Sequence, residues 1–287
     1  MNATMHLDRQ PAILPLYINC LTKPTKNRLD LAAISQMKLE FQHCSIKPKQ
    51  LKKFNRFYNL NHTQHVPLTF LYLLVFRPQL KFLLNPKLPF SVLGLVHVFN
   101  HIQSFKPVYL EDNLTIDIQT KEFKETAKGK ELVLTTRILR NDECVWQCFS
   151  GYLSPHKTRN VKRPNTPYEK PHYFHSMDWH IPANTGRQFA LLSGDANPIH
   201  TYKLAAKLFG FKQAIAHGMC SAIKCWASLP HSTSAMKKEL YTEFKKPIFL
   251  PSTVRFEYEK QLNGKYAFQV ENPQNKTALQ GYYQETP

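Results

Sequence analysis

Two side chains in the second half of the sequence have the types and the spacing of a catalytic acid–base pair. Asp195 and His200 lie five residues apart, on either side of an Asn197-Pro198 pair. Asn197 is a good N-cap, and Pro198 suits the first turn of a helix. We therefore expect a helix over Pro198–Phe209, with His200 in its first turn. The positive end of a helix disfavours a protonated imidazole, so a neutral His200 can act as a general base, and both side chains can face one water molecule.

A second candidate is the backbone at Gly218. The chain has only nine glycines, and three of them (Gly194, Gly210 and Gly218) lie near the acid–base pair, which indicates special demands on the backbone there. A helix is expected to begin near His217-Gly218, where the first N–H groups have no partner within the helix. These donors would stabilise the charge that a thioester carbonyl gains as an enolate forms, unless Gly218 serves only close packing.

The segment SGDANPIH (Ser193–His200), followed by AIAHGM (Ala214–Met219), resembles the signature of the MaoC-like dehydratases, which include the (R)-specific enoyl-CoA hydratases. That signature runs Ser/Thr-Gly-Asp-x-Asn-Pro-apolar-His and continues to a His-Gly pair. All eight consecutive positions match, and His217 follows His200 by seventeen residues, as the family expects. The resemblance is strong across Thr185–Val254.

This resemblance implies a reaction and a set of roles. Asp195 and His200 would activate a water that adds to the β-carbon of a trans-2-enoyl thioester, giving an (R)-3-hydroxyacyl thioester, and dehydration would be the reverse. The amide of Gly218 would polarise the thioester carbonyl. No metal and no redox cofactor would be needed, and coenzyme A or acyl carrier protein would carry the acyl group. The residues that would shape and position the loop are Ser193, Gly194, Asn197, Pro198 and His217.

One position departs from the family pattern. Some members carry a serine on the second helix that contacts the catalytic pair, but the eighth residue after Gly218 is Trp226. Ser221 and Ser228 are out of register, so neither is assigned this role. Trp226 is expected either to shape an acyl tunnel or to belong to the core.

An internal repeat indicates the fold that must position the catalytic segment. Phe105–Ile118 and Phe244–Tyr258 share a Phe-Lys start, a proline before an apolar triplet, a polar turn and an alternating strand. Each follows an apolar segment that we interpret as a helix, Gly94–Ile102 in the first half and Ala214–Leu229 in the second. This pattern predicts a duplicated unit of one long helix against an antiparallel sheet. Together with the resemblance, it predicts an α+β double hotdog.

Three parts of the chain follow from this division. We expect an N-terminal degenerate hotdog at residues 1–153, a basic, proline-containing linker at 154–170, and a catalytic MaoC-like hotdog at 171–287. The first part would begin with a strand at Leu14–Cys20 and a basic helix near Pro48.

The first hotdog is expected to house the acyl chain rather than to catalyse. It has no Asn-Pro-x-His motif, and Val98 follows His97 where the second half has a glycine. His97 would then be a core or vestigial residue. The apolar segment Leu68–Leu84 would supply the tunnel walls.

The charge of the chain points to an anionic partner without naming it. Lys and Arg number 38 against 20 Asp and Glu, a net charge of +18. Such a surface attracts nucleic acid, anionic lipid, phosphorylated cofactors or an acidic carrier protein. The basic run Lys47–Arg56 is either a solvated helix face or a site that attracts coenzyme A phosphates or an acidic carrier.

The cysteines and the apolar runs indicate where the protein works. Six cysteines without a Cys-x-x-Cys pair favour reduced thiols. The N-terminus lacks the features of a signal peptide, and the longest apolar run, Pro67–Phe76, is about half of a membrane span. We therefore expect a soluble, cytoplasmic enzyme without a membrane span, as a monomer or homodimer.

Other functions stay open on the sequence alone. A hotdog acyl-thioesterase also uses a carboxylate and a helix N-terminus, and a non-catalytic acyl-binding subunit would have no need for both Asp195 and His200. Nucleic-acid binding rests on the charge alone, since no recognised motif is present, and we expect none. His172, His175 and His180 lack the accompanying ligands of a metal site, so no metal is expected there.

Overall fold

The computed structural model describes residues 4–23, 30–61, 65–155, 173–231 and 235–286. Its helices are α1 (Ile13–Thr22), α2 (Leu31–Ser35), α3 (Pro48–Tyr58), α4 (Leu68–Leu83), α5 (Thr185–Ser193), α6 (Pro198–Thr201), α7 (Lys203–Leu208) and α8 (Gly218–Ala227), with a 3-10 turn at Val92–Gly94. Its strands are β1 (Met5–Leu7), β2 (Lys38–Cys44), β3 (Val96–Ser104), β4 (Leu114–Thr126), β5 (Gly129–Arg140), β6 (Glu143–Pro155), β7 (His175–Ile181), β8 (Lys237–Phe244), β9 (Ser252–Lys260), β10 (Tyr266–Glu271) and β11 (Thr277–Thr286).

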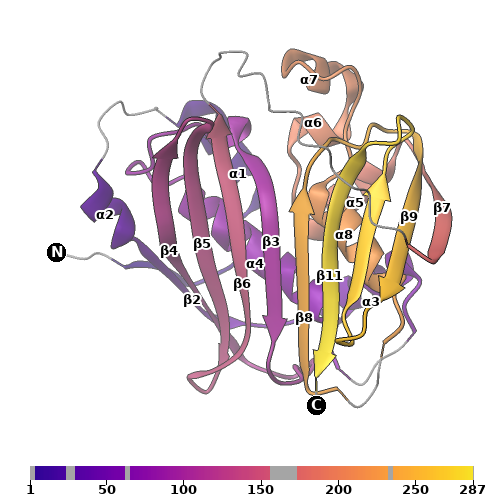
Figure 1. Ribbon diagram of the computed structural model, residues 1–287. Helices are drawn as coiled ribbons and strands as arrows, with labels where there is room; N and C mark the ends of the chain where they lie inside the picture. The colour runs from indigo at the N-terminus through magenta and orange to yellow at the C-terminus, as the bar shows by residue number, and fades with distance from the viewer. Residues whose placement is uncertain (1–3, 24–29, 62–64, 156–172, 232–234, 287) are drawn as a thin grey trace.

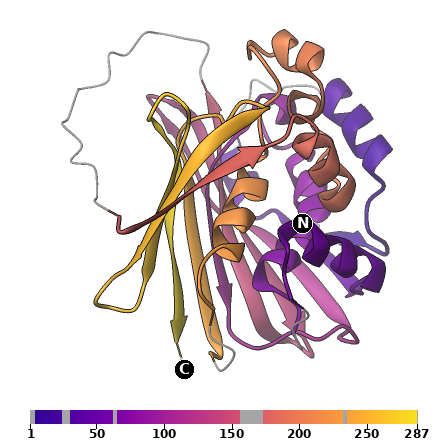
Figure 2. The same ribbon diagram turned by 90° about the vertical axis from the view of Figure 1, so that its right-hand side faces the viewer.

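The strands form one 11-stranded sheet in the order β1-β2-β4-β5-β6-β3-β8-β11-β10-β9-β7. This order contains one arrangement twice: β2-β4-β5-β6-β3 and, from the opposite edge, β7-β9-β10-β11-β8. In each set a helix, α4 or α8, comes between the first and second strands of the chain and lies on the concave side of the sheet (Figures 1 and 2). Antiparallel strands wrapped around one central helix are a hotdog, so the predicted α+β double hotdog is confirmed.

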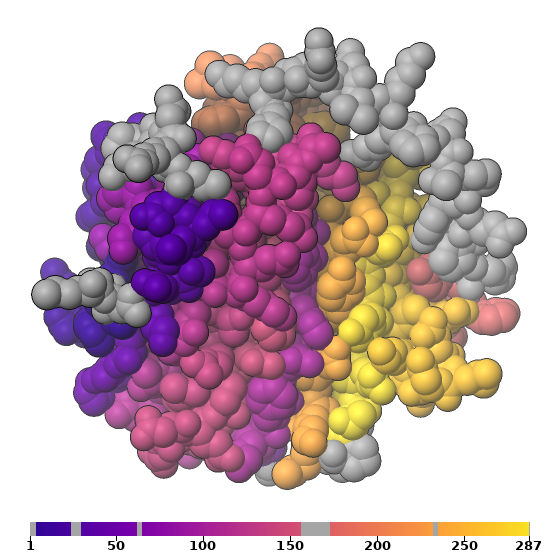
Figure 3. Space-filling view, turned by 60° about the vertical axis from the view of Figure 1, so that its left-hand side comes forward, coloured from indigo at the N-terminus to yellow at the C-terminus, as the bar shows by residue number. Residues whose placement is uncertain are grey.

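The two sets meet at a central pair of strands. β3 and β8 run antiparallel, with Asn100 opposite Thr242 and Ser104 opposite Lys238. Backbone hydrogen bonds therefore connect the halves directly. On the outer face of the sheet, the magenta strands of the first half adjoin the orange and yellow strands of the second as one surface (Figure 3).

The repeat found in the sequence marks equivalent connections. Phe105 follows β3 and leads to β4, and Phe244 ends β8 and leads to β9. The helix predicted at Gly94–Ile102 is wrong, because this segment is the end of a 3-10 turn followed by β3. Its inward side chains, Asn100 and Ile102 among them, alternate with partly exposed ones, which is the period of a strand. The central helix of the first half is instead α4.

The strand predicted at Leu14–Cys20 is also wrong, because this segment lies in helix α1. A short apolar run cannot be assigned to strand or helix by periodicity alone. Here the periodicity is further blurred because α1 buries Leu16 and Cys20 while it exposes Leu14, Ile18 and Leu21 on the opposite side. The basic helix predicted near Pro48 is confirmed as α3.

α4 is buried almost all round, as a helix at the centre of a core must be. One of its buried polar side chains, Gln79, donates from Nε2 to Thr136 Oγ1 (2.9 Å) and Ser150 Oγ (3.2 Å) on the sheet, and accepts from the Tyr152 hydroxyl (3.3 Å). Asn100 donates to the same Ser150 oxygen at 2.9 Å. These bonds satisfy polar groups that would otherwise be costly to bury. That this half houses an acyl chain stays a prediction.

The boundaries of the parts stay a prediction as well. β6 continues through Pro155, so the first two residues of the predicted linker, 154–170, belong to a strand, and the remainder lies outside the described residues. All six cysteines are described and carry free thiols. None of the helices in the described ranges is long and apolar enough to cross a membrane.

Candidate active site

The loop between α5 and α6 has a backbone that its sequence explains residue by residue. α5 ends at Gly194, which takes the left-handed conformation with φ 84° that glycine adopts without strain. The Ser193 hydroxyl donates to the Phe189 carbonyl (2.8 Å) and accepts from the N–H of Asp195 (3.0 Å). Asn197 then caps α6 through its side-chain oxygen, which accepts from the N–H of Ile199, as predicted.

The helix predicted over Pro198–Phe209 is broken in two. Pro198 does occupy its first turn, but Tyr202 is extended, with φ −138° and ψ 134°, so α6 ends at Thr201 and α7 restarts at Lys203. Propensity favoured one continuous helix, and the tertiary position of α6 overrides it. Gly186 of α5 packs so closely under α6 that a Cβ there would lie 1.8 Å from the His200 carbonyl oxygen.

His200 is held with one ring nitrogen bound and the other free for chemistry. Its Nδ1 donates to the carbonyl of Ile215 at 2.8 Å, which leaves Nε2 as the unprotonated nitrogen of a neutral ring. Burial lowers the pKa of His200 below its ordinary 6.5, although the Asp195 charge and the Ile215 carbonyl act in the opposite direction. His200 is therefore a neutral base at neutral pH.

Asp195 has one carboxylate oxygen engaged by the protein. Its Oδ1 accepts from the Tyr17 hydroxyl at 2.9 Å and from the N–H of Asn197 at 3.3 Å. Burial and the Asp195 charge raise the pKa of Tyr17, so this phenol keeps the proton that it donates. The carboxylate is thus oriented from two sides, by α1 of the first half and by its own loop.

His217 holds the loop in place through the backbone of Asp195. Its Nε2 donates to the backbone carbonyl of Asp195 at 2.9 Å, and its ring stacks on that of His200 with centroids 3.9 Å apart. Burial, with the neighbouring His200, lowers the pKa of His217 to about 3. A neutral ring in this position fits a side chain that orients its neighbours.

The N-terminus of α8 adjoins the His200–His217 stack, because His217 directly precedes the helix. His217 is the N-cap and Gly218 the first helical residue, so the first amides of α8 have no partner within the helix. A Cβ at Gly218 would lie 2.9 Å from the Phe244 ring, so glycine lets this ring pack against the first turn of α8.

The structure thus brings Asp195, His200, His217 and Gly218 together, with Ser193, Gly194, Asn197 and Pro198 forming the loop between them. Sequence reasoning missed two residues of the first half. Tyr17 is 178 residues from Asp195, and the guanidinium of Arg77 packs over Gly194, where a Cβ would lie 2.5 Å from its Nε. No motif or spacing links residues so far apart, and only the pairing of the two halves brings them to the loop.

Three aromatic residues form a buried stack in the first half. Tyr72 stacks on His97 with ring centroids 6.4 Å apart, and the Asp195 charge contributes to the pKa of Tyr72, His97 and Tyr152. His97 stacks on Tyr152 with centroids 5.0 Å apart and contacts Phe244 at 5.0 Å. His97, expected on a helix, lies in β3, and burial lowers its pKa to about 4. It is a neutral member of this stack.

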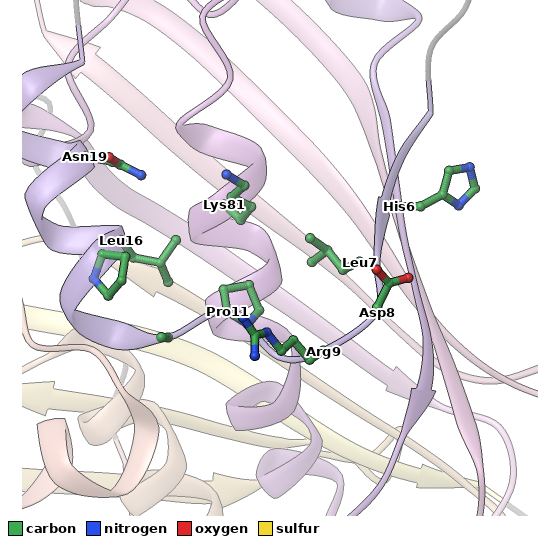
Figure 4. A pocket seen from close by; sticks show the side chains of 10 residues that line it. His6, Leu7, Asp8, Arg9, Pro11, Leu16, Asn19 and Lys81 are labelled. Atoms are coloured by element: carbon green, nitrogen blue, oxygen red, sulfur yellow. The ribbon is translucent and has the colours of Figure 1, made fainter.

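Trp226, at the position where some relatives have serine, is buried beside His231, with ring centroids 4.6 Å apart. The pocket in Figure 4 lies elsewhere: α1, the residues before it and Lys81 of α4 line it, and none of the catalytic residues takes part.

A metal ion is a possible alternative occupant of this cluster. One carboxylate oxygen of Asp195 and one ring nitrogen each of His200 and His217 lie within 4.8 Å of one another. One nitrogen of each ring is already used, because Nδ1 of His200 and Nε2 of His217 donate to backbone carbonyls at 2.8 and 2.9 Å. The prediction that no metal is needed stays a prediction. His175 and His180 lie five positions apart on β7 and so face opposite sides of it, while His172 is outside the described residues.

Known proteins are similar to this chain in sequence and in fold. A family model described as MaoC like domain matches residues 162–280. The protein 3-hydroxyacyl-thioester dehydratase X of Mycobacterium tuberculosis is 28% identical over 211 residues, which cover 72% of this chain and 75% of that protein. A crystal structure of HtdX from Mycobacterium tuberculosis is 25% identical with a TM-score of 0.72, covering 86% of this chain and 99% of its own.

A MaoC-like dehydratase from Phytophthora capsici has a TM-score of 0.74 at 18% identity, covers 90% of this chain and 98% of its own, and supports the fold alone. The MaoC like domain match, residues 162–280, contains the loop that holds Asp195 and His200, and the solved structures share the hotdog fold of this chain.

Proposed function

We propose that this protein catalyses the reversible hydration of trans-2-enoyl thioesters to (R)-3-hydroxyacyl thioesters. The observation that carries this proposal is the state of the catalytic pair. Oδ1 of Asp195 and Nδ1 of His200 are each hydrogen-bonded by protein partners, whereas no residue in the described ranges forms a hydrogen bond with Nε2 of His200 or with Oδ2 of Asp195, which lies 4.0 Å from Nε2 of His217. A water with two hydrogen bonds of about 2.8 Å at a tetrahedral angle joins atoms about 4.6 Å apart. One carboxylate oxygen of Asp195 and one ring nitrogen of His200 lie within 4.8 Å of each other, a separation of the size that one shared water would span.

The reaction follows from these positions. The water oxygen attacks the β-carbon of the enoyl group while the catalytic pair takes one of its protons. The electron pair of the carbon–carbon double bond moves toward the thioester carbonyl, where the amide of Gly218 stabilises the developing charge. The proton held by the pair then passes to the α-carbon, so that H and OH have added across the double bond. Dehydration reverses each step.

The neutral state of His200 supports a proton transfer from water to the catalytic pair. A ring whose pKa is lowered by burial accepts a proton from water only transiently and returns it readily. His217 and Asn197 would act indirectly, by fixing the Asp195 carbonyl and carboxylate. The acyl carrier is proposed to be coenzyme A or acyl carrier protein, and no metal or redox cofactor is required for any step.

The test compares the protein with Asp195→Asn and His200→Gln, using crotonyl-CoA and a longer enoyl-CoA. Loss of the ultraviolet absorbance of the enoyl thioester is followed in each case. Asp178→Asn is the matched control, because Asp178 is an exposed carboxylate whose partner is Arg255, at 3.3 Å. We expect activity in the wild type and the control, and a loss of at least about 100-fold in the two site variants.

The product and the carrier require two further readings. An (R)-specific 3-hydroxyacyl-CoA dehydrogenase should consume the product, and an (S)-specific one should not. Enoyl groups on acyl carrier protein are tested in parallel. Release of free thiol without any change in the enoyl group would contradict hydration and favour a thioesterase. Unchanged activity in Asp195→Asn would remove the proposed role of the pair.

A further inference from the structure

The acidic residues of this chain are unevenly distributed. The sequence has none between Glu40 and Glu111, and between Asp178 and Glu239 the catalytic Asp195 stands alone. These two spans contain α3 to α8, so the helices on the concave side of the sheet are basic, while carboxylates concentrate on the strands. Residues 41–110 and 179–238 together hold 16 Lys and Arg residues, 9 in the first span and 7 in the second, against the single Asp195.

The most prominent part of this side is α7, directly after the catalytic histidine. In Figures 1 and 2, α6 and α7 project beyond the end of the sheet. α7 exposes Leu204 (78%) and Leu208 (87%), and Leu191 of α5 is equally exposed. Large apolar side chains gathered in this way mark an interaction surface.

Lysines accompany the two leucines of α7 along the chain. Lys203, Lys207 and Lys212 are exposed, and in the part of the chain that the structure describes none of them forms an ion pair. Arg187 joins α5 to this region, because its Nη1 donates to the Thr201 carbonyl at 3.3 Å. We call the three leucines and three lysines the docking face, whose residues are Leu191, Leu204, Leu208, Lys203, Lys207 and Lys212.

α1 adds a second apolar stripe on the same side. Leu14, Ile18 and Leu21 share one face of the helix and are exposed, and no charged residue lies within α1. Tyr17 of α1 bonds Asp195 at 2.9 Å, which fixes this helix beside the loop that leads to α6 and α7. Figure 2 shows the indigo helix α1 on the same side of the sheet as α5.

We propose that the docking face binds the surface of an anionic lipid bilayer. A bilayer interface accepts protruding leucines into its acyl boundary and attracts lysines to its headgroups, so one partner satisfies both features. The face is a projecting end rather than a groove, which suits a planar partner. It carries no carboxylate that would be repelled. Docking would bring the catalytic loop close to the interface where amphiphilic acyl thioesters concentrate.

The experiment measures co-sedimentation of the full chain with vesicles of phosphatidylcholine, alone or mixed with phosphatidylglycerol. We expect binding to the mixed vesicles that weakens as salt is added, and little binding to phosphatidylcholine alone. The double variant Leu204→Ser/Leu208→Ser should reduce the partition coefficient at least about tenfold. Lys203→Gln/Lys207→Gln should reduce it about fivefold for each lysine removed.

Matched controls lie at the turn between β9 and β10. Leu262 is fully exposed (110%), and Lys260 is a nearby lysine on a strand end. Leu262→Ser and Lys260→Gln should bind vesicles as the wild type does. Thermal unfolding and hydration of crotonyl-CoA, which needs no membrane, check that each variant is folded. If that hydration is absent in the wild type, vesicle binding still decides the docking proposal independently.

Three results would overturn the proposal. The wild type could fail to bind mixed vesicles, or Leu204→Ser/Leu208→Ser could bind as well as Leu262→Ser. Sedimentation velocity could show a dimer that these leucine variants dissociate, which would assign the face to a second copy of the chain. Binding to acyl carrier protein through the same lysines, without vesicle binding, would assign it to an acidic protein.

Discussion

Replacing Tyr17 by phenylalanine removes the hydroxyl group that links the two halves at the carboxylate of Asp195, the proposed catalytic residue. The Tyr17 hydroxyl donates to Oδ1 of Asp195 at 2.9 Å, and the N–H of Asn197 at 3.3 Å is the weaker second donor. A hydrogen bond to a charged group contributes about 1.5–3 kcal/mol. If the bond is fully used in the transition state, its loss lowers kcat/KM by a factor of about 10 to 150.

Whether kcat or KM changes distinguishes a positioning role of Tyr17 from a general loss of structure. Tyr17 would act through Asp195, so Tyr17→Phe should lower kcat while KM for an enoyl thioester stays nearly unchanged. Steady-state kinetics on crotonyl-CoA and a longer enoyl-CoA provide the measurement. The hydroxyl leaves a ring of the same shape, so packing of α1 should be retained.

Tyr58→Phe is the matched control for this prediction. The Tyr58 hydroxyl is also buried and donates at 3.3 Å to the carbonyl of Cys220, a neutral backbone group rather than a carboxylate. We expect this variant to lose about 1 kcal/mol of folding stability with kcat preserved. Equal kcat in the two variants, or a wild-type kcat in Tyr17→Phe, would refute the reasoning.

Three further predictions concern the histidines and the close-packed glycines. Burial lowers the pKa of His97 to about 4 and that of His217 to about 3, against an ordinary 6.5. Below pH 6.5 the unfolded chain therefore binds more protons at these two residues than the folded chain does. The folded state loses stability as the pH falls from 6.5 toward 4. The free energy of unfolding measured with urea should be about 3 kcal/mol lower at pH 5.5 than at pH 7.5 because of these two residues. His97→Phe should remove about half of this difference, and an unchanged difference would contradict the assignment. Gly218→Ala should lower kcat at least about tenfold, because its Cβ would lie 2.9 Å from the Phe244 ring. Phe244→Leu in the same chain should recover part of the loss in an enoyl hydration assay. Full activity in Gly218→Ala would contradict the idea that the Phe244 ring restricts this position, since alanine keeps the backbone N–H. Gly186→Ala should lower the free energy of unfolding by about 1–3 kcal/mol and should also lower activity, because its Cβ would lie 1.8 Å from a backbone oxygen that cannot rotate away. Thermal or urea unfolding measures the loss. Unchanged stability would show that α5 and α6 separate freely.

The catalytic loop could be predicted from the sequence because its determinants are local. Asn197 as cap, Pro198 in the first turn and Gly194 with a positive φ each follow from the conformational preference of one residue. The family resemblance then implied the meeting of Asp195 and His200 in advance.

What failed were features decided by tertiary contacts. Leu14–Cys20 is apolar on both faces of α1, so its period does not distinguish a helix from a strand. The break at Tyr202 follows from the seating of α6 on α5, which no propensity records. Tyr17 reaches Asp195 only because the two halves share one sheet, and a distance of 178 residues along the chain leaves no local signal.

The pairing of β3 with β8 has a consequence for assembly. In a pair of separate hotdog chains, a joint of this kind would depend on protein concentration, and dilution would dissolve any site that needs both partners. Here both strands belong to one chain, so the joint forms as an intramolecular step at a high effective concentration. The Tyr17–Asp195 contact, which crosses from one half to the other, should therefore persist at any dilution, and the specific activity per chain should not fall in the nanomolar range where many dimers separate.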